Sequence, residues 1–239
     1  MSLPDVAYGT SPPRKSDMVY RAIKQDLIRG KYKVGQDLVI VDLSGRLGTS
    51  RQPVLEALKC LDREGFVEVI PQIGVRTIRP TADGVRDFYR VFGNVEGLAA
   101  EIAAGRVLPD EMEQLRLRTV EMDERVSAGE VPMIDYLLLN RRVHSAIHTM
   151  TGSPEVVRAA EAYWDKSDFL IATIFGSSDD ANSFRVSHDH DAILQAIERG
   201  DAPGARKLAT EHILSVGRAL ADRLQHSSDS TAATPGVAI

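Results

Sequence analysis

SRQPVLEALKCLDREG, residues 50–65, is the stretch that decides the fold of the N-terminal part of this chain. Ser50 can accept a hydrogen bond from a backbone N–H at a helix start, and Pro53 is tolerated because first-turn N–H groups have no intrahelical partner. Gly65 can adopt the left-handed conformation that ends a helix. The pattern therefore predicts a helix with well-defined ends.

The neighbouring segments place this helix in a larger motif. A shorter helix is expected at residues 41–48, one tight turn earlier, which is the order found in a helix-turn-helix. Two β-rich runs, 66–70 and 75–79, follow around a glycine-containing turn, and an amphipathic helix near residues 17–29 comes first. Together these segments predict a winged helix-turn-helix.

The basic residues are concentrated in this module. Residues 14–80 carry 13 lysines and arginines and 8 aspartates and glutamates, a net charge of +5. The remainder carries 16 basic and 26 acidic residues, a net charge of −10, and the two values give the −5 of the whole chain. Contact with phosphates requires positive charge, so its combination with the helix-turn-helix indicates DNA binding.

Length and composition favour two domains. The 239 residues, 43% of them hydrophobic, are enough for two buried cores. A single cysteine, Cys60, excludes an intrachain disulfide framework and a cysteine-type zinc site. No apolar run approaches the roughly 18 residues of a membrane span, and the N-terminus lacks a signal-peptide core. We therefore expect a cytoplasmic, nucleoid-associated protein with no membrane partner.

The part after residue 80 is expected to be almost wholly helical. Segments with a 3.6-residue period, separated by short glycine and proline breaks, predict an all-α antiparallel bundle of six to seven helices. The predicted helices lie near residues 82–106, 109–128, 132–150, 154–175, 181–199 and 202–225. The fold class is thus mainly α, with a small two-stranded wing, and residues 1–15 and 227–239 are expected to be disordered tails.

Three histidines of the bundle are expected to point inward. His144 lies four residues after Asn140, so both face the same way, and His148 continues their stripe. His190 and His212 lie on apolar stripes of two further helices. Converging neutral imidazoles indicate a divalent-metal site, with the Asn140 oxygen as a fourth ligand. The alternative is a set of hydrogen-bonded core histidines without a metal.

The helix-turn-helix pattern extends over many positions. The matching residues are Val19 to Gly30, Gly35, Leu38, Asp42, Leu43, Leu47, Gly48, Ser50, Arg51, Pro53, Val54, Glu56, Ala57, Leu58, Leu61 and Gly65. With this pattern the chain, over about residues 17–225, resembles GntR-family transcription regulators of the FadR subfamily, whose second domain is of the FCD type. The resemblance implies a DNA-binding domain at residues 16–80 and a domain for effector binding and dimerisation at residues 81–226.

The family's metal motif begins with an aspartate four residues before a histidine, and here that pair reads Asn140 and His144. The next two family ligands fall at His190, which opens His-x-x-Ile-Leu-x-Ala-Ile, and at His212, which closes Ala-(x6)-His. The resemblance implies a divalent metal, zinc or nickel, at these positions. Because a neutral amide binds a cation less strongly than a carboxylate, weaker occupancy or a metal-free site is the alternative.

The residues that contact the operator are expected to differ from those of many relatives. Leu55 and Val41 occupy positions where many relatives carry DNA-contacting arginines. Arginine, lysine and glutamine are the side chains that pair with base edges and phosphates, so this leaves the basic and amide groups near the start of the helix at 50–65. We expect DNA contacts from Arg46, Ser50, Arg51, Gln52 and, in the wing, Gly74.

The resemblance also implies a small organic acid as the effector, bound at or near the metal. Phe92 stands where relatives that bind carboxylates often place an arginine. The effector of those relatives therefore cannot be assigned to this chain from the resemblance alone. Phe92, Tyr163, Trp164 and Phe169 are candidates for an aromatic wall. Arg141 or Arg142 is a candidate for a cation near the ligand, and at most one of the two can face inward. The alternative is that the aromatic residues are ordinary core and the arginines are solvent-exposed.

These observations predict a ligand-responsive repressor that binds a near-palindromic operator of double-stranded DNA as a homodimer, and not an enzyme. Two alternatives stay open. One is a metal-dependent enzyme in which Asp165, Asp168 or Glu161 serves as the base. The other is a metabolite sensor that has lost sequence-specific DNA reading, as the residues at positions 41 and 55 allow.

Overall fold

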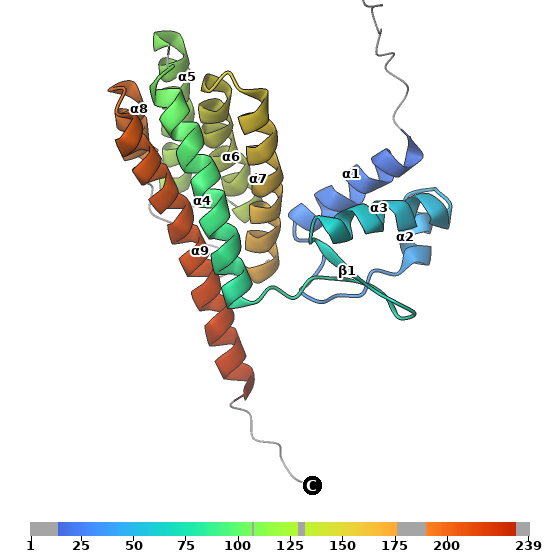
Figure 1. The fold of residues 1–239 in the computed structure, drawn as a ribbon. Helices are drawn as coiled ribbons and strands as arrows, with labels where there is room; N and C mark the ends of the chain where they lie inside the picture. Colours follow the sequence, from blue (N-terminus) through green and yellow to red (C-terminus); the bar gives the residue numbers. More distant parts are fainter. Residues whose placement is uncertain (1–13, 107, 129–131, 176–189, 233–239) are drawn as a thin grey trace, which may run out of the picture. The chain divides into compact units, whose positions relative to one another are not determined.

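A computed structural model describes residues 14–106, 108–128, 132–175 and 190–232 (Figure 1). The chain divides into two compact units, one built from residues up to Ile78 and the other from Arg79 onward, with residues Ile28–Val34 grouped with the second. The expected tail at residues 1–15 lies outside the described residues as far as position 13, and the expected tail at 227–239 lies outside them from position 233.

The first unit is a winged helix-turn-helix, as the sequence predicts. Its antiparallel wing pairs Val67 with Thr77 and Val69 with Val75. Val54, Leu58 and Leu61 of the third helix are buried together with the apolar stripe of the first helix. The elements are α1 (Lys15–Ile28), α2 (Ile40–Arg46), α3 (Arg51–Arg63), β1 (Val67–Ile70) and β2 (Gly74–Thr77).

The two ends of α3 differ in how well the sequence predicted them. Gly65 has φ 72°, and its N–H bonds to the Asp62 carbonyl while the N–H of Phe66 bonds to the Leu61 carbonyl. This is the Schellman arrangement that a glycine after a helix allows, so the predicted stop is confirmed. Ser50 is the N-cap residue with extended backbone, but its side chain makes no capping hydrogen bond, so the predicted hydroxyl cap is wrong.

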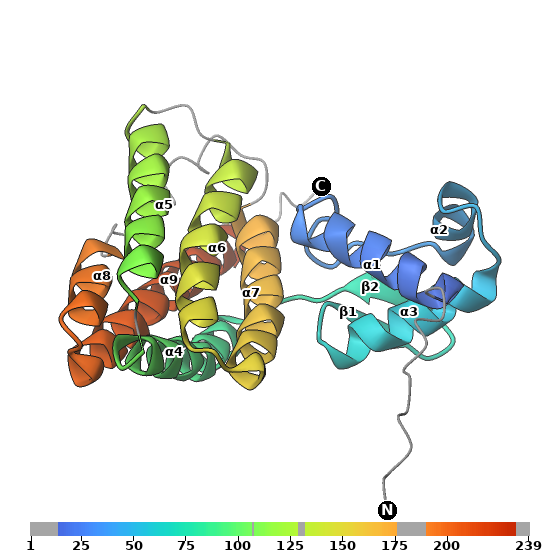
Figure 2. The same ribbon diagram turned by 90° about the horizontal axis from the view of Figure 1, so that it is seen from above.

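The second unit is a helical bundle (Figure 2). Its helices among the described residues are α4 (Ala82–Ala104), α5 (Pro109–Ser127), α6 (Met133–Met150), α7 (Pro154–Phe175), α8 (His190–Glu198) and α9 (Ala202–Ala232). The first nine residues of the predicted helix at 181–199 lie outside the described part. The predicted end of the last helix at residue 225 is too early, because no glycine or proline follows before Pro235.

Helices α4 and α9 pack closely along their lengths, as both views show (Figures 1 and 2). A Cβ at Gly217 of α9 would lie 2.5 Å from the Cβ of Tyr89 on α4, and one at Gly97 would lie 2.9 Å from the Arg206 carbonyl oxygen. The small residues therefore allow the two backbones to approach each other. This approach fixes His212 of α9 relative to Glu96 of α4.

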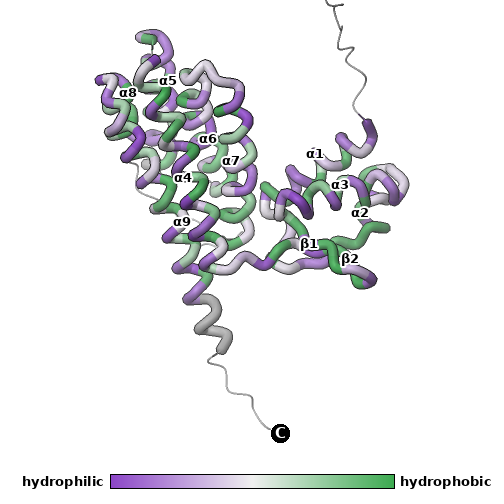
Figure 3. Tube along the Cα trace, viewed as in Figure 1, coloured by the Kyte–Doolittle hydropathy of each residue, from purple (hydrophilic) through white to green (hydrophobic). Residues whose placement is uncertain are grey.

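Apolar and polar residues alternate along the helices of the second unit (Figure 3). Side chains from all six of these helices fill the interior, among them Phe92, Leu115, Val143, Phe169, Ile193 and Leu220. Among the described residues, six histidine and acidic side chains are also buried there: Glu96, His144, His148, Asp168, His190 and His212. No described helix is long and apolar enough to cross a membrane.

Candidate metal centre and nucleic-acid interface

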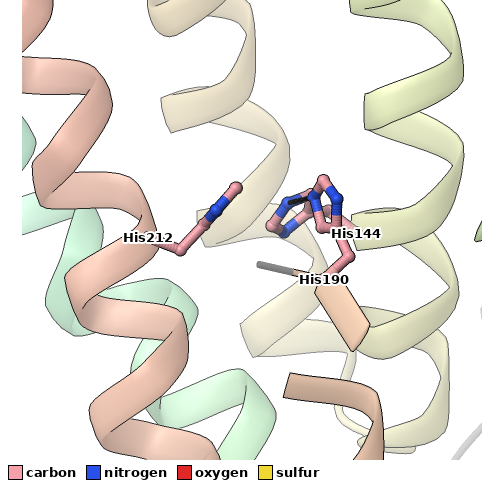
Figure 4. Close-up of side chains that lie close together, drawn as sticks. All are labelled: His144, His190 and His212. Atoms are coloured by element: carbon pink, nitrogen blue, oxygen red, sulfur yellow. Dashed lines mark hydrogen bonds between the residues drawn. The ribbon is translucent and has the colours of Figure 1, made fainter. Parts of the chain in front are cut away.

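Three histidines from three helices meet inside the second unit (Figure 4). His144 comes from α6, His190 from the first turn of α8 and His212 from α9, and each is at most 4% exposed. One ring nitrogen from each lies within 4.8 Å of those of the other two. The inward orientation predicted from the apolar stripes therefore brings three potential ligands to one point.

The spacing of the imidazoles suits a shared ion. Nε2 of His144 and Nε2 of His190 are 3.3 Å apart, and the ring centroids of His190 and His212 are 4.6 Å apart. Two nitrogens bound at about 2.05 Å to one tetrahedral zinc ion lie roughly 3.3 Å from each other. The same separation also permits a hydrogen bond between two neutral imidazoles, so the distance fits a metal without requiring one.

Asn140 lies one helical turn before His144 on α6 and is 8% exposed. Its Oδ1 atom is buried and accepts no hydrogen bond from the described part of the chain. An amide oxygen in that condition costs free energy unless an ion or another donor satisfies it. The residues present thus fit a divalent metal with three nitrogen ligands and one oxygen ligand.

Glu96 of α4 contacts this cluster through His144. Its Oε2 lies 2.8 Å from Nδ1 of His144, and its Oε1 lies 2.7 Å from Nε2 of His148. Trp164 of α7 donates its indole N–H to the same Oε1 at 2.9 Å. The side chains of Glu96, His144 and His148 are all nearly inaccessible to solvent.

Two opposing effects act on the Glu96 carboxyl. Burial by itself raises its pKa, but the charge of His148 and the hydrogen bonds with His144 and His148 lower it and together outweigh burial. The histidines therefore hold the pKa of Glu96 well below its usual range. A carboxylate in this setting is an ionised acceptor facing N–H groups.

The candidates for an aromatic pocket form a packed cluster. Phe92 is fully buried, stacks on Tyr163 with ring centroids 5.7 Å apart and meets Trp164 edge to face at 5.3 Å. Trp164 in turn lies 4.6 Å from the His144 ring. Phe92 is thus placed as core between α4 and α7, whereas Trp164 reaches the histidine cluster directly.

Arg141 is not a solvent-exposed charge. It donates to Asp165 at 2.5 Å and to Asp168 at 2.9 Å, both on α7. Burial raises the pKa of Asp168 to about 7, although the charge of Arg141 opposes the shift. Arg142, by contrast, is exposed. The guanidinium of Arg141 is therefore held between α6 and α7.

The residues expected at DNA lie at the exposed end of α3 and nearby. Arg51 and Gln52 in its first turn are exposed, and Gln52 donates to Glu56 at 3.1 Å. Arg46 of α2 forms an ion pair with Asp26 of α1 at 2.6 Å. Ser50 and Gly74 are both exposed, Ser50 beside α3 and Gly74 at the start of β2. Of the three polar side chains at 46, 51 and 52, Arg46 is the one fixed to another helix.

Sequence reasoning missed Glu96 as part of the site and left His148 without a partner. The signal for Glu96 was present, because it lies on the apolar stripe of α4 that includes Phe92, Ala99 and Ala103. A glutamate on a buried stripe needs donors or a cation. The sequence does not show which histidines supply those donors, since that depends on how α4, α6 and α7 pack.

The family profiles match both units. The profile of bacterial regulatory proteins of the gntR family matches residues 15–76, and that of the FCD domain matches residues 87–215. The chain is 25% identical over 205 residues to the HTH-type transcriptional repressor GlaR of Escherichia coli, covering 82% of this chain and 91% of that protein. It is 26% identical over 181 residues to the Nta operon transcriptional regulator of Aminobacter aminovorans, covering 74% and 82%.

Solved structures show the same fold. McbR/YncC of Escherichia coli superposes with a TM-score of 0.70 at 19% identity, covering 90% of this chain and 99% of that one. A GntR transcriptional regulator from a Rhodococcus strain gives a TM-score of 0.66 at 20% identity, covering 86% and 97%. The order of a winged helix-turn-helix followed by a helical bundle is therefore shared with these structures.

Proposed function

The chain belongs to the GntR family of bacterial regulatory proteins with an FCD domain, and from this we propose that it is a repressor whose hold on DNA is set by a small carboxylate metabolite. It acts as a homodimer on a near-palindromic operator. Residues 16–80 form the DNA-binding domain, and residues 81–226 bind the effector and the second subunit. As a DNA-bound repressor it works in the cytoplasm, at the nucleoid.

The observation that carries the effector half of this proposal is the histidine cluster. His144, His190 and His212 would hold a divalent metal, zinc or nickel, with the Asn140 oxygen as a fourth ligand. The metal supplies a positive charge that a carboxylate can bind. Trp164, whose ring lies 4.6 Å from that of His144, would pack against the ligand's apolar part.

The observation that carries the DNA half is the exposed start of α3. Arg51 can form a paired contact with guanine, and Gln52 one with adenine, when the N-terminal end of this helix enters a major groove. Two copies of α3 in a homodimer would enter successive grooves. The net charge of +5 over residues 14–80 favours the phosphate contacts that set the register.

Effector binding controls DNA binding if it favours one arrangement of the dimer over another. A coupling free energy of about 1 to 3 kcal/mol between the two sites changes DNA affinity by roughly 5- to 150-fold. Because the histidines belong to α6, α8 and α9, a ligand bound at the cluster would contact three helices at once. We expect ligand binding to change the relative positions of these helices, and this change to alter the arrangement of the dimer.

The experiment that tests this function is recovery of genomic fragments by the purified full-length protein at physiological salt. Enrichment of one or a few near-palindromic sites is the expected result, and the neighbouring genes would then indicate the effector class. Equal recovery of all fragments would contradict sequence-specific repression. The salt concentration must be fixed, because phosphate contacts make affinity strongly dependent on it.

One contact disfavours the reading as a metal-dependent enzyme. Asp165 and Asp168, two of the carboxylates that could serve as a base, both accept hydrogen bonds from Arg141. These hydrogen bonds hold both carboxylates against the guanidinium of Arg141, which competes with any water or substrate for them. The regulator is therefore the function that the described residues support best.

A further inference from the structure

We infer that Glu96 is a positioning residue of the histidine site: it fixes the tautomer of His144 and supplies the negative charge that the site's own donors lack. The effect of Glu96 on metal affinity rests on the proposed metal-binding function. The tautomer of His144 does not, because it follows from contacts within the protein itself.

The first step is the direction of the hydrogen bonds around Glu96. The indole of Trp164 can only donate, and it points to Oε1, which also lies 2.7 Å from Nε2 of His148. The remaining oxygen, Oε2, lies 2.8 Å from Nδ1 of His144. An ionised carboxylate can only accept, so Nδ1 of His144 must carry a proton.

The second step concerns the other nitrogen of the same ring. A neutral imidazole carries one proton, so a proton on Nδ1 leaves a lone pair on Nε2 of His144. That Nε2 is the atom that lies 3.3 Å from Nε2 of His190. The tautomer fixed by Glu96 therefore presents an unprotonated nitrogen at the point where the three histidines meet.

The third step is the charge of the donor set. Three neutral imidazoles and the neutral Asn140 amide carry no charge to balance that of a divalent ion. Burying an ion among such groups costs free energy, because its charge is removed from water without a compensating negative charge. Glu96 is 2% exposed and lies one imidazole ring away from the ligand nitrogen of His144. Hydrogen bonding to this carboxylate would make the imidazole of His144 a stronger ligand for a bound ion.

His148 and Trp164 keep Glu96 in place. They approach the same oxygen from α6 and α7, while His144 binds the other oxygen, so the carboxylate is tied to two neighbouring helices. A side chain on α4 with three such contacts cannot turn away without leaving buried N–H groups unpaired. The orientation of His144 thus depends on a network that includes a histidine outside the cluster.

The test is Glu96→Gln in the full-length protein. The glutamine carbonyl must face Trp164, which can only donate, so the amide NH₂ would face Nδ1 of His144. That nitrogen would then become the acceptor, and the proton would move to Nε2. We expect the ¹⁵N spectrum of the metal-free protein, at about pH 8, to show this change of tautomer. We expect Zn²⁺ affinity, measured by calorimetry, to fall 10- to 100-fold.

The matched control is Glu101→Gln, which makes the same chemical change on the same helix. Glu101 pairs with Arg206 at 2.5 Å, and both side chains are partly exposed. The control should keep the wild-type tautomer of His144 and bind Zn²⁺ within about twofold of the wild type. A loss of affinity in both variants would overturn the specific role of Glu96.

Two further results would overturn the inference. One is a wild-type spectrum in which His144 carries its proton on Nε2, which also decides the matter if Glu96→Gln does not fold. The other is a folded Glu96→Gln protein with the wild-type tautomer and unchanged Zn²⁺ affinity. A wild-type protein that binds no Zn²⁺ would contradict the proposed metal function and the effect of Glu96 on affinity, while the spectrum would still decide the tautomer.

Discussion

Arg141 on α6 donates to Asp168 on α7 at 2.9 Å, yet the other carboxylate oxygen of Asp168 is buried and accepts no hydrogen bond from the described residues. Asp165, one turn earlier on α7, adds a second negative charge beside the same guanidinium. Burial and this neighbouring charge together raise the pKa of Asp168 to about 7, against the effect of Arg141. When Asp168 is ionised, only one of its two carboxylate oxygens therefore accepts a hydrogen bond from the described residues.

Asp168 should make stability depend on pH near neutrality. Its pKa is about 7 in the folded chain and near 3.8 ordinarily, so the folded state holds the proton more tightly. The resulting stabilisation is complete below about pH 4 and is lost as the pH rises through 7. Relative to Asp168→Asn, the free energy of unfolding of the wild type should fall by on the order of 1 kcal/mol per pH unit in this window.

Urea unfolding followed by fluorescence is suited to this measurement, because the chain has one tryptophan and Trp164 is buried in the helical unit. Asp83→Asn, at an exposed position on α4, is the control and should show no such trend relative to the wild type. A difference between wild type and Asp168→Asn that stays constant from pH 5 to 8 would count against the raised pKa.

The sequence predicted most of the fold because its signals are local. Gly65 ends α3 through contacts within four residues, and proline or glycine breaks mark the ends of most bundle helices. Ser50 shows the limit of such signals. Its residue type suits an N-cap, but the residue type does not determine the rotamer, and here the Ser50 side chain makes no capping hydrogen bond.

For the site, the sequence predicts only which side of its own helix each residue occupies. Inward stripes gave His144, His190 and His212, because each lies on the apolar side of its own helix. The partners of Arg141 and Glu96 depend on which helices become neighbours and in what register, and a single helix carries no signal for that. Arg141 accordingly contacts two aspartates of α7 that sequence reasoning had considered only as bases of an enzyme.

Removing one histidine of the cluster should remove the response to metal. We expect Zn²⁺ to raise the thermal midpoint of the wild type, because an ion that binds only the folded state stabilises it by about 2.7 kcal/mol at 100 times its dissociation constant. His212→Ala should lose this shift. His226→Ala, an exposed histidine on the same helix, should retain it. Equal shifts in all three proteins would place the metal elsewhere.

Asn140→Asp should strengthen metal binding. The carboxylate would place a charged oxygen where the Asn140 amide oxygen is buried and unpaired among the described residues. We expect the Zn²⁺ dissociation constant to fall at least tenfold, which corresponds to about 1.4 kcal/mol. Asn94→Asp on the exposed side of α4 makes the same change away from the cluster and should leave the constant unaltered. Unchanged or weaker binding by Asn140→Asp would mean that position 140 is not a ligand.

Arg51→Ala should weaken operator binding and relax its specificity. Arg51 is exposed in the first turn of α3, whereas Arg46 is already paired with Asp26, so Arg51 is the arginine best placed to meet a guanine. Loss of such a paired contact costs about 1 to 3 kcal/mol, or roughly 5- to 150-fold in affinity. Arg63→Ala, at the opposite end of α3, is the control and should bind nearly as the wild type does.

The comparison that decides the role of Arg51 uses two DNA fragments, the recovered operator and a scrambled sequence of equal length, at one fixed salt concentration. If Arg51 reads a base, the variant loses affinity for the operator and much less for the scrambled fragment. If Arg51 only contacts phosphate, both affinities fall by the same factor, because phosphates carry no sequence. In that case Gln52 would be the residue of α3 to test next for base reading, since it is exposed in the same turn.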